Sequence, residues 1–270
     1  MQADSLQHWV DQQMIRGKYI FTKGDVLAQG LSLTEESLRT ALSRLVKKGM
    51  IVSPWQNFYV TVPTEYRLKG EIPPSFYIDR LMKHLGRDYY VSLLSAAALN
   101  GAGHQRAMVF QVTVNGAPIR SGVKNGVRLD FTLRNPLPMA SVKQVKTQMG
   151  FMNVSSPELT ALDLVFNEEK VGGLSRVAEV LIELAENMHF DESSANLLAF
   201  FNAPVIQRLG YLLDLIEEHE LADRLLMLAQ KQGKLFRKIR LKQSKSQTDK
   251  MAIDGRWKVI INQEIETDEI

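Results

Sequence analysis

The stretch from Leu31 to Val62 constrains the fold more than any other part of the sequence, because it predicts a helix followed at once by a hairpin. The apolar residues of the helix recur at spacings of three and four and are Leu38, Ala41, Leu42, Leu45 and Val46. Thr34 or Ser32 caps its start, and Gly49 ends it. Two β-prone runs, Met50–Ser53 and Phe58–Val62, then predict the hairpin.

The opposite side of this helix is basic and rich in hydroxyl groups. Its residues are Arg39, Thr40, Ser43, Arg44 and Lys47. With shorter helices expected at 5–15 and 23–28, the order matches a winged helix-turn-helix, in which a helix enters the major groove and a hairpin contacts the backbone or minor groove. We therefore predict that these five side chains, and Asn57 in the hairpin turn, bind DNA. The alternative is a solvated face on a structural three-helix unit.

Residues 63–74 indicate a domain boundary, because they contain three prolines, one glycine and no apolar period. We expect a winged helix-turn-helix domain over 1–66 and a second domain over 67–270. The second opens with helices predicted at 75–85 and 89–100. Strands are predicted at Met108–Val114, Val127–Arg134 and Val142–Met149. The fold class is thus α+β: the N-terminal winged helix-turn-helix is followed by a mixed domain with a small β-sheet and a C-terminal helical bundle.

From Val154 onward the pattern predicts helices. Ser155 and Glu158 suggest a capping box for the first, in which Leu159, Leu162 and Phe166 are expected core residues and Asp163 a structural anchor. Gly172-Gly173 ends that region, and further helices are expected at 174–188, 193–201, 203–219 and 221–231. The basic segment 232–250 is expected to be a mobile tail, and 256–264 a final strand.

Charge is strongly segregated along the chain. Residues 89–152 carry seven basic groups and one acidic group, whereas residues 153–230 carry four basic and 14 acidic groups. The basic block predicts extra phosphate contacts from the sheet, and an acidic lobe is expected to face away from DNA. The predicted contact residues are Arg106, Arg120, Lys124, Arg128 and Lys143. The alternative is that these side chains form solvated surface.

The sequence offers little for catalysis. Having no cysteine, it has no disulfide, thiolate metal site or cysteine nucleophile, which fits a cytoplasmic protein. No apolar run reaches the ~18 residues of a membrane span, and the start lacks a secretory signal pattern. We predict no enzyme activity, cofactor or metal, and we interpret His104, after a glycine-rich turn, as part of a helix C-cap. Asp130 with Lys143 and Lys146 is similar to metal-dependent nucleases, but Gln144 stands where a second carboxylate is needed.

Several stretches of the predicted second domain resemble the AbiEi-type antitoxins of abortive-infection toxin–antitoxin systems. They occur in the family's order and are YYVSLLSAAALNGAGHQ (89–105), FQV (110–112), VSSPELTALDLV (154–165) with Gly172-Gly173, QRLGYLLD (207–214) and RWKVIIN (256–262). The resemblance implies an N-terminal winged helix-turn-helix that represses the operon and an antitoxin domain over 67–270. It also implies a functional partner, a nucleotidyltransferase-like toxin encoded next to it, and no catalytic residues.

Two other functions remain open from the sequence. A stand-alone transcriptional regulator that senses a ligand predicts a concave apolar pocket with a few converging polar groups. A metal-dependent nuclease predicts clustered carboxylates in the folded protein.

Overall fold

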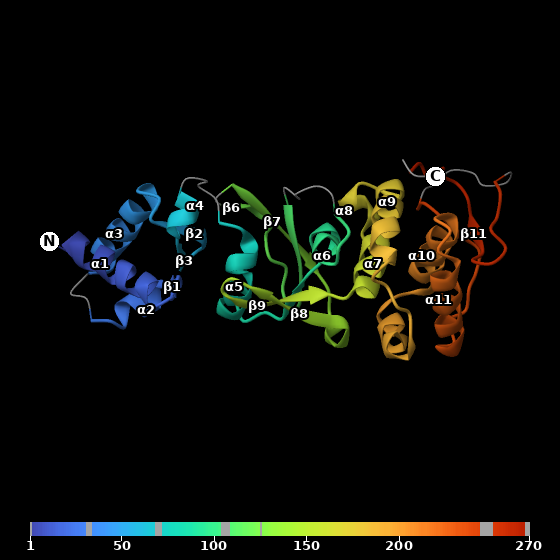
Figure 1. Ribbon diagram of the computed structural model, residues 1–270, viewed down its shortest axis with the longest axis horizontal. Helices are drawn as coiled ribbons and strands as arrows, with labels where there is room; N and C mark the ends of the chain where they lie inside the picture. The colour runs from blue at the N-terminus through green and yellow to red at the C-terminus, as the bar shows by residue number, and fades with distance from the viewer. Residues whose placement is uncertain are drawn as a thin grey trace.

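The N-terminal unit lies at one end of an elongated molecule and a group of helices at the other, with a six-stranded sheet between them (Figure 1). The computed structural model describes residues 2–30, 34–67, 72–103, 109–124, 126–243 and 251–267. None of the helices within these ranges is long and apolar enough to cross a membrane. The arrangement is a mixed α+β fold, as the sequence predicts.

The N-terminal unit consists of α1 (Gln2–Ile15), β1 (Ile20–Thr22), α2 (Lys23–Leu27), α3 (Glu35–Lys47), β2 (Ile51–Trp55) and β3 (Phe58–Thr61). Its strands form an antiparallel sheet in the order β1-β3-β2. Thr34 caps α3 by accepting a hydrogen bond from the backbone N–H of Ser37 at 3.2 Å, which confirms one of the two predicted caps. The other candidate, Ser32, lies outside the described residues.

The sheet of this unit has a core on each side. Leu38, Leu42 and Leu45 of α3 pack with α1 and α2. Val60 and Phe58 of β3 instead belong to a second core, which they share with α5 and the six-stranded sheet. The N-terminal unit therefore does not bury all of its own apolar residues.

The middle of the chain begins with short helices and continues into the large sheet. Its elements are α4 (Thr64–Arg67), the 3₁₀ turn η1 (Pro74–Phe76), α5 (Ile78–His84), β4 (Tyr89–Val91), α6 (Leu93–Leu99), β5 (Val109–Val114), β6 (Gly122–Lys124), β7 (Val127–Leu133), η2 (Met139–Ser141), β8 (Val142–Thr147) and β9 (Gly150–Ser155). The strand order is β6-β7-β5-β4-β9-β8. Pairs β5–β7 and β4–β9 are parallel, and the other pairs are antiparallel.

Two predictions in this region are wrong. The helix expected over 89–100 is a strand and a shorter helix, because Tyr89–Val91 enters the sheet between β5 and β9 and is buried there. Val154 and Ser155 likewise belong to β9 and not to a helix. The cap of the next helix is Ser156, because the Ser155 hydroxyl is buried 2.7 Å from that of Thr160.

The C-terminal part is mainly helical. Its elements are α7 (Pro157–Phe166), α8 (Glu168–Val171), α9 (Leu174–Ala185), the 3₁₀ helix η3 (Glu192–Phe200), α10 (Ala203–Leu215), α11 (His219–Lys231), β10 (Ile239–Arg240) and β11 (Val259–Ile260). Gly172 and Gly173 have positive φ angles of 103° and 92° and separate α8 from α9, as predicted. The expected helix over 193–201 is a 3₁₀ helix.

The predicted tail over 232–250 is also corrected in part. Ile239–Arg240 pairs in parallel with Val259–Ile260, so this portion is structured, while 244–250 lies outside the described residues. The final strand has two residues and not the nine expected over 256–264. Its neighbour Trp257 is completely buried among the helices.

Each face of the six-stranded sheet supports a different core. Val91, Val112 and Phe131 face the N-terminal hairpin and α5. Tyr90 points to the other face and joins the core of the C-terminal helices. Because side chains alternate along a strand, the sheet connects the two ends of the molecule through opposite faces.

Candidate functional site

The first candidate site is the outer face of α3. Leu38, Leu42 and Leu45 are buried, and the amphipathic pattern consequently turns the opposite side to solvent. All five side chains predicted there are exposed: Arg39, Thr40, Ser43, Arg44 and Lys47. None of the five forms a side-chain hydrogen bond or ion pair with another described residue. This face therefore presents three cations and two hydroxyl groups that are free to contact a ligand.

The hairpin beside α3 contacts the rest of the molecule through Asn57 and Trp55. Asn57 is exposed at the turn, where its φ of 59° suits an asparagine, and its carbonyl accepts a hydrogen bond from Lys23 N at 3.0 Å. Trp55 is half-buried, with its ring centroid 6.2 Å from that of Phe131 on β7. The turn of the hairpin, where Gln56 and Asn57 are exposed, is thus placed to contact another molecule.

The predicted basic residues of the sheet do not form one surface. Arg120, Arg128 and Lys143 are exposed. Lys143 pairs with Val154 and shares the face of Val91 and Val112, whereas Arg128 points to the other face. Their strands, β7 and β8, are also four steps apart in the sheet, roughly 19 Å at the usual spacing. Arg106, His104 and the side chain of Lys124 lie outside what the structure describes.

The same topology separates the residues of the nuclease alternative. Asp130 lies on β7, whereas Lys143 and Lys146 lie on β8, four strands further across the sheet. Within the described ranges, no group of three or more histidine, aspartate or glutamate side chains is placed to hold a metal ion.

A second candidate site is built around a buried ion pair. Arg134 follows β7 and places Nη2 2.7 Å from Oδ1 of Asp163 on α7. The other carboxylate oxygen accepts a hydrogen bond from the Tyr90 hydroxyl on β4 at 2.9 Å. The side chains of Arg134 and Asp163 are only 13% and 2% exposed. Asp163 is therefore an anchor between sheet and helix, as the sequence predicts, with Arg134 and Tyr90 as partners.

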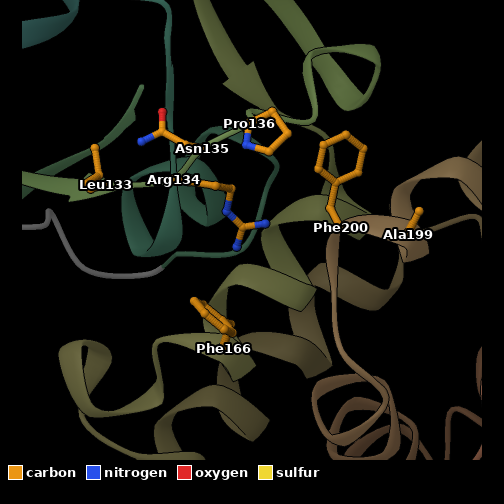
Figure 2. A pocket seen from close by; sticks show the side chains of 7 residues that line it. All are labelled: Leu133, Arg134, Asn135, Pro136, Phe166, Ala199 and Phe200. Atoms are coloured by element: carbon orange, nitrogen blue, oxygen red, sulfur yellow. The ribbon is translucent and has the colours of Figure 1, made fainter. Parts of the chain in front are cut away.

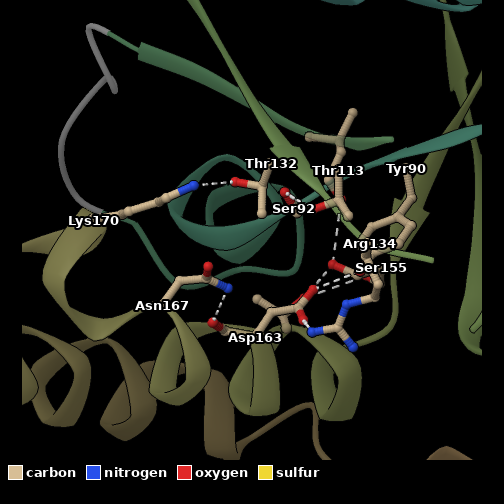
Figure 3. A network of polar contacts seen from close by, with 11 residues as sticks. Tyr90, Ser92, Thr113, Thr132, Arg134, Ser155, Asp163, Asn167 and Lys170 are labelled. Carbon is tan, nitrogen blue, oxygen red and sulfur yellow. Dashed lines mark hydrogen bonds and ion pairs between the residues drawn. The ribbon is translucent and has the colours of Figure 1, made fainter. Parts of the chain in front are cut away.

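Polar contacts on both sides hold this arrangement in place (Figure 3). Thr113 on β5 donates to the Ser92 hydroxyl at 2.9 Å. Lys170 on α8 donates to the Thr132 hydroxyl on β7 at 2.9 Å. These contacts join β5 to the start of α6 and β7 to α8, next to the Arg134–Asp163 ion pair.

Burial decides the electrostatics of the ion pair. Removal from water raises the pKa of the Asp163 carboxyl to about 6, and the Arg134 charge and the Tyr90 hydrogen bond oppose this rise only in part. Burial also raises the pKa of Tyr90 well above its ordinary value, with a further contribution from the Asp163 charge. Tyr90 consequently remains a hydrogen-bond donor at neutral pH.

Arg134 also lies at the wall of a pocket of about 480 Å³ (Figure 2). The lining residues are Leu133, Arg134, Asn135, Pro136, Phe166, Ala199 and Phe200. The guanidinium carbon is 4.4 Å from the ring centroid of Phe201 and 5.3 Å from that of Phe166, distances at which cation–π attraction acts. Phe166, predicted as core, is 54% exposed, because it is the last residue of α7 and extends past the helices that bury the rest.

Sequence reasoning found only part of this site. Asp163 within the apolar run TALDLVF signals that a buried carboxylate requires a partner. Nothing local identifies that partner as Arg134, 29 residues earlier in the chain. Tyr90 carries no polar signal either, since tyrosines in an apolar run are common core residues.

Together, the fold and these sites define a mixed α+β protein with a basic helix at one end and a buried ion pair between its sheet and C-terminal helices. Residues 90–215 match the family model of the AbiEi antitoxin C-terminal domain. The match over this part of the chain supports an AbiEi-type antitoxin and confirms the resemblance seen in the sequence. The matched segment contains Tyr90, Arg134, Asp163 and the pocket, and it supports an antitoxin role.

A solved structure has a similar fold at low sequence identity. The crystal structure of the RV2827C protein from Mycobacterium tuberculosis aligns with 93% of this chain and 89% of its own, with a TM-score of 0.65 and 16% identity. An antigenic nucleotidyltransferase-like protein from Paracoccidioides brasiliensis aligns with 56% of this chain and 89% of its own, at 12% identity. Its TM-score of 0.38 is too low to support an argument. No curated protein matches the sequence.

Proposed function

We propose that this protein is the antitoxin of an AbiE-like toxin–antitoxin system and that it also represses its own operon by binding promoter DNA. The observation that carries the DNA-binding part is the outer face of α3, with its five exposed side chains free of contacts to other described residues. The family match over 90–215 supports the antitoxin part. We propose no enzymatic activity and no cofactor.

The order of elements supports a winged helix-turn-helix as the DNA-binding unit. Helix, strand, two helices and a hairpin follow one another from α1 to β3, and β1 completes the small sheet. In this layout α3 is the recognition helix, and the turn at Asn57 is the tip of the wing. Arg39 and Arg44 suit bidentate contacts to guanine or phosphate, and Lys47 suits phosphate.

We propose a division of labour between residues 1–66 and 67–270, with repression in the first and antitoxin activity in the second. The functional partner is a nucleotidyltransferase-like toxin encoded in the same operon. Because Val60 and Phe58 share a core with the large sheet, cutting the chain at residue 66 would expose apolar surface. The division is better tested by substitutions in the full-length protein.

The test compares Arg44→Ala with Arg224→Ala. Arg224 is an exposed arginine on α11, at the far end of the molecule, so its loss changes the net charge equally (Figure 1). Binding to the protein's own promoter region is measured by fluorescence anisotropy, and rescue by co-expression with the adjacent toxin. Arg44→Ala should weaken binding about fivefold to a hundredfold, the typical effect of a lost bidentate base contact, and should retain rescue. Arg224→Ala should leave both unchanged.

The two halves of the proposal can fail separately. Unchanged affinity and sequence preference in Arg44→Ala would show that α3 does not read DNA. Wild-type protein that gives no rescue from the co-expressed toxin would refute the antitoxin role.

One observation favours the alternative of a ligand-responsive regulator. That function predicts a concave apolar pocket with a few converging polar groups, and the pocket beside Arg134 has this character. In this case promoter binding would change when the pocket is occupied, without a toxin being present.

A further inference from the structure

The Arg134 side chain is held as a ligand-binding group would be held. The rings of Phe166 and Phe201 lie near its guanidinium, and Asp163 accepts from Nη2. Such contacts fix the rotamer before any ligand arrives, so less side-chain entropy is lost on binding. Structural contacts alone thus provide a preorganised cation at a pocket wall.

The same guanidinium keeps unused hydrogen-bond donors. Among the residues that the structure describes, Arg134 has Asp163 as its hydrogen-bond partner, so Nε and Nη1 donate to none of them. Neither Nε nor Nη1 of Arg134 is a buried atom that lacks a hydrogen-bond partner. An acceptor entering the pocket can therefore reach N–H groups of a largely buried cation, where charge-assisted hydrogen bonds are stronger than at an open surface.

The rest of the pocket wall is mainly apolar. Leu133, Phe166 and Phe200 are 44%, 54% and 39% exposed, although each is a large hydrophobic residue. Figure 2 shows Arg134 between Pro136 and Phe166, with Phe200 to one side. The amide of Asn135 is already hydrogen-bonded to the backbone of Gly116, which leaves Arg134 as the charged contact.

We propose that this pocket binds an apolar group that carries a carboxylate. The carboxylate accepts hydrogen bonds from Arg134, and the apolar group covers Phe166 and Phe200. A free aromatic or branched-chain acid offers this chemistry, and so does the C-terminal residue of a protein chain. The inference is independent of DNA binding and of rescue, since the pocket can be tested without promoter or toxin.

The experiment titrates full-length protein with N-acetylphenylalanine by calorimetry, and follows the Ala199 methyl signal by NMR to locate the binding. N-acetylphenylalaninamide removes the negative charge, and N-acetylglycine removes the ring. Each should bind roughly tenfold more weakly, as expected for one lost charge-assisted hydrogen bond or one lost aromatic contact. An acetylated tetraglycine peptide ending in phenylalanine distinguishes the sources, because tighter binding of this peptide indicates a protein chain end.

Variants assign the binding to Arg134. Arg134→Gln alone leaves the buried Asp163 carboxylate unpaired, so we combine it with Asp163→Asn, which removes both charges. The double variant should lose the preference for the acid over the amide. Phe166→Ala tests the apolar wall of the pocket with less risk to folding, because this exposed ring contributes little to the core.

Some results would overturn the proposal. One is that the wild type does not bind the acid up to its solubility limit. Another is that the wild type binds the acid and the amide with equal affinity. The third is that a folded double variant binds the acid as tightly as the wild type. A merely structural ion pair predicts equal affinity of the wild type for the acid and the amide, so that comparison separates the two roles.

Discussion

Gly210 on α10 lies directly against the indole of Trp257, and a Cβ at position 210 would be 2.3 Å from two of its ring carbons. Trp257 donates its indole N–H to Asp214 at 2.6 Å, and its carbonyl accepts from Gln207 at 2.6 Å. The stretches 207–214 and 256–262, two of the five on which the family resemblance rests, therefore pack as one unit. The second is part of this contact although it lies beyond the matched segment.

Gly210→Ala should destabilise the protein by about 1–3 kcal/mol, the usual cost of overpacking, because the added Cβ would overlap the completely buried indole. Urea unfolding followed by circular dichroism measures this. Gly122→Ala is the matched control, since a Cβ there meets nothing within 4 Å. Equal stability of the two variants would mean that Trp257 can shift.

Leu162 and Phe166 lie on the same helix but should differ sharply on truncation. Leu162 is completely buried, so Leu162→Ala should cost about 2–5 kcal/mol. Phe166 is more than half exposed, so Phe166→Ala should cost less than about 1 kcal/mol. The free energies of unfolding in urea provide the comparison. Similar losses from both variants would contradict the exposure of Phe166.

The raised pKa of Asp163 predicts a pH dependence of stability. Because the folded pKa of about 6 exceeds the ordinary 3.8, the native state binds more protons than the unfolded state between these values. The stability from this carboxyl is present below pH 3.8 and is lost as pH rises to about 6. The free energy of unfolding of wild type minus that of Asp163→Asn should therefore fall over this range, on the order of 1–3 kcal/mol, and then level off.

Asp191→Asn is the control of opposite sign. A hydrogen bond from the Ser193 side chain is the main reason that the pKa of Asp191 is lowered. Wild type should therefore gain stability relative to Asp191→Asn as pH rises. The same direction for both variants would contradict the assigned electrostatics.

The basic residues of the sheet predict a limited salt effect. If the sheet contacts DNA phosphates, each lost contact lowers the slope of log K against log salt by about 0.9. Because Arg128 and Lys143 lie on opposite faces and near opposite edges, at most one of Arg128→Ala and Lys143→Ala should lower it. Promoter binding measured at several salt concentrations decides this. If the slope is lower in both variants, the strand topology is contradicted. If it is lower in neither variant, the basic residues of the sheet form solvated surface.

Local patterns in the sequence were sufficient for the elements that depend on neighbouring residues. The apolar repeat of α3, its Thr34 cap and the exposure of Arg39 and Arg44 follow from helical periodicity alone. The glycine pair after α8 follows equally from local backbone preference. The family resemblance over residues 90–215 was identifiable as well, because the short stretches there keep their order in the chain.

Only the tertiary structure decided which distant residues meet. Tyr89–Val91 is a strand because it pairs with two other strands, the nearer of which begins 18 residues later in the chain. The same pairing brings Tyr90 within hydrogen-bonding distance of Asp163. Arg128 and Lys143 are far apart because of the strand order, which their composition does not reveal. Phe166 is exposed because it is the last residue of α7, although helical periodicity places it on the apolar side. Periodicity encodes which side of an element is apolar, but the packing of whole elements determines which groups that side meets.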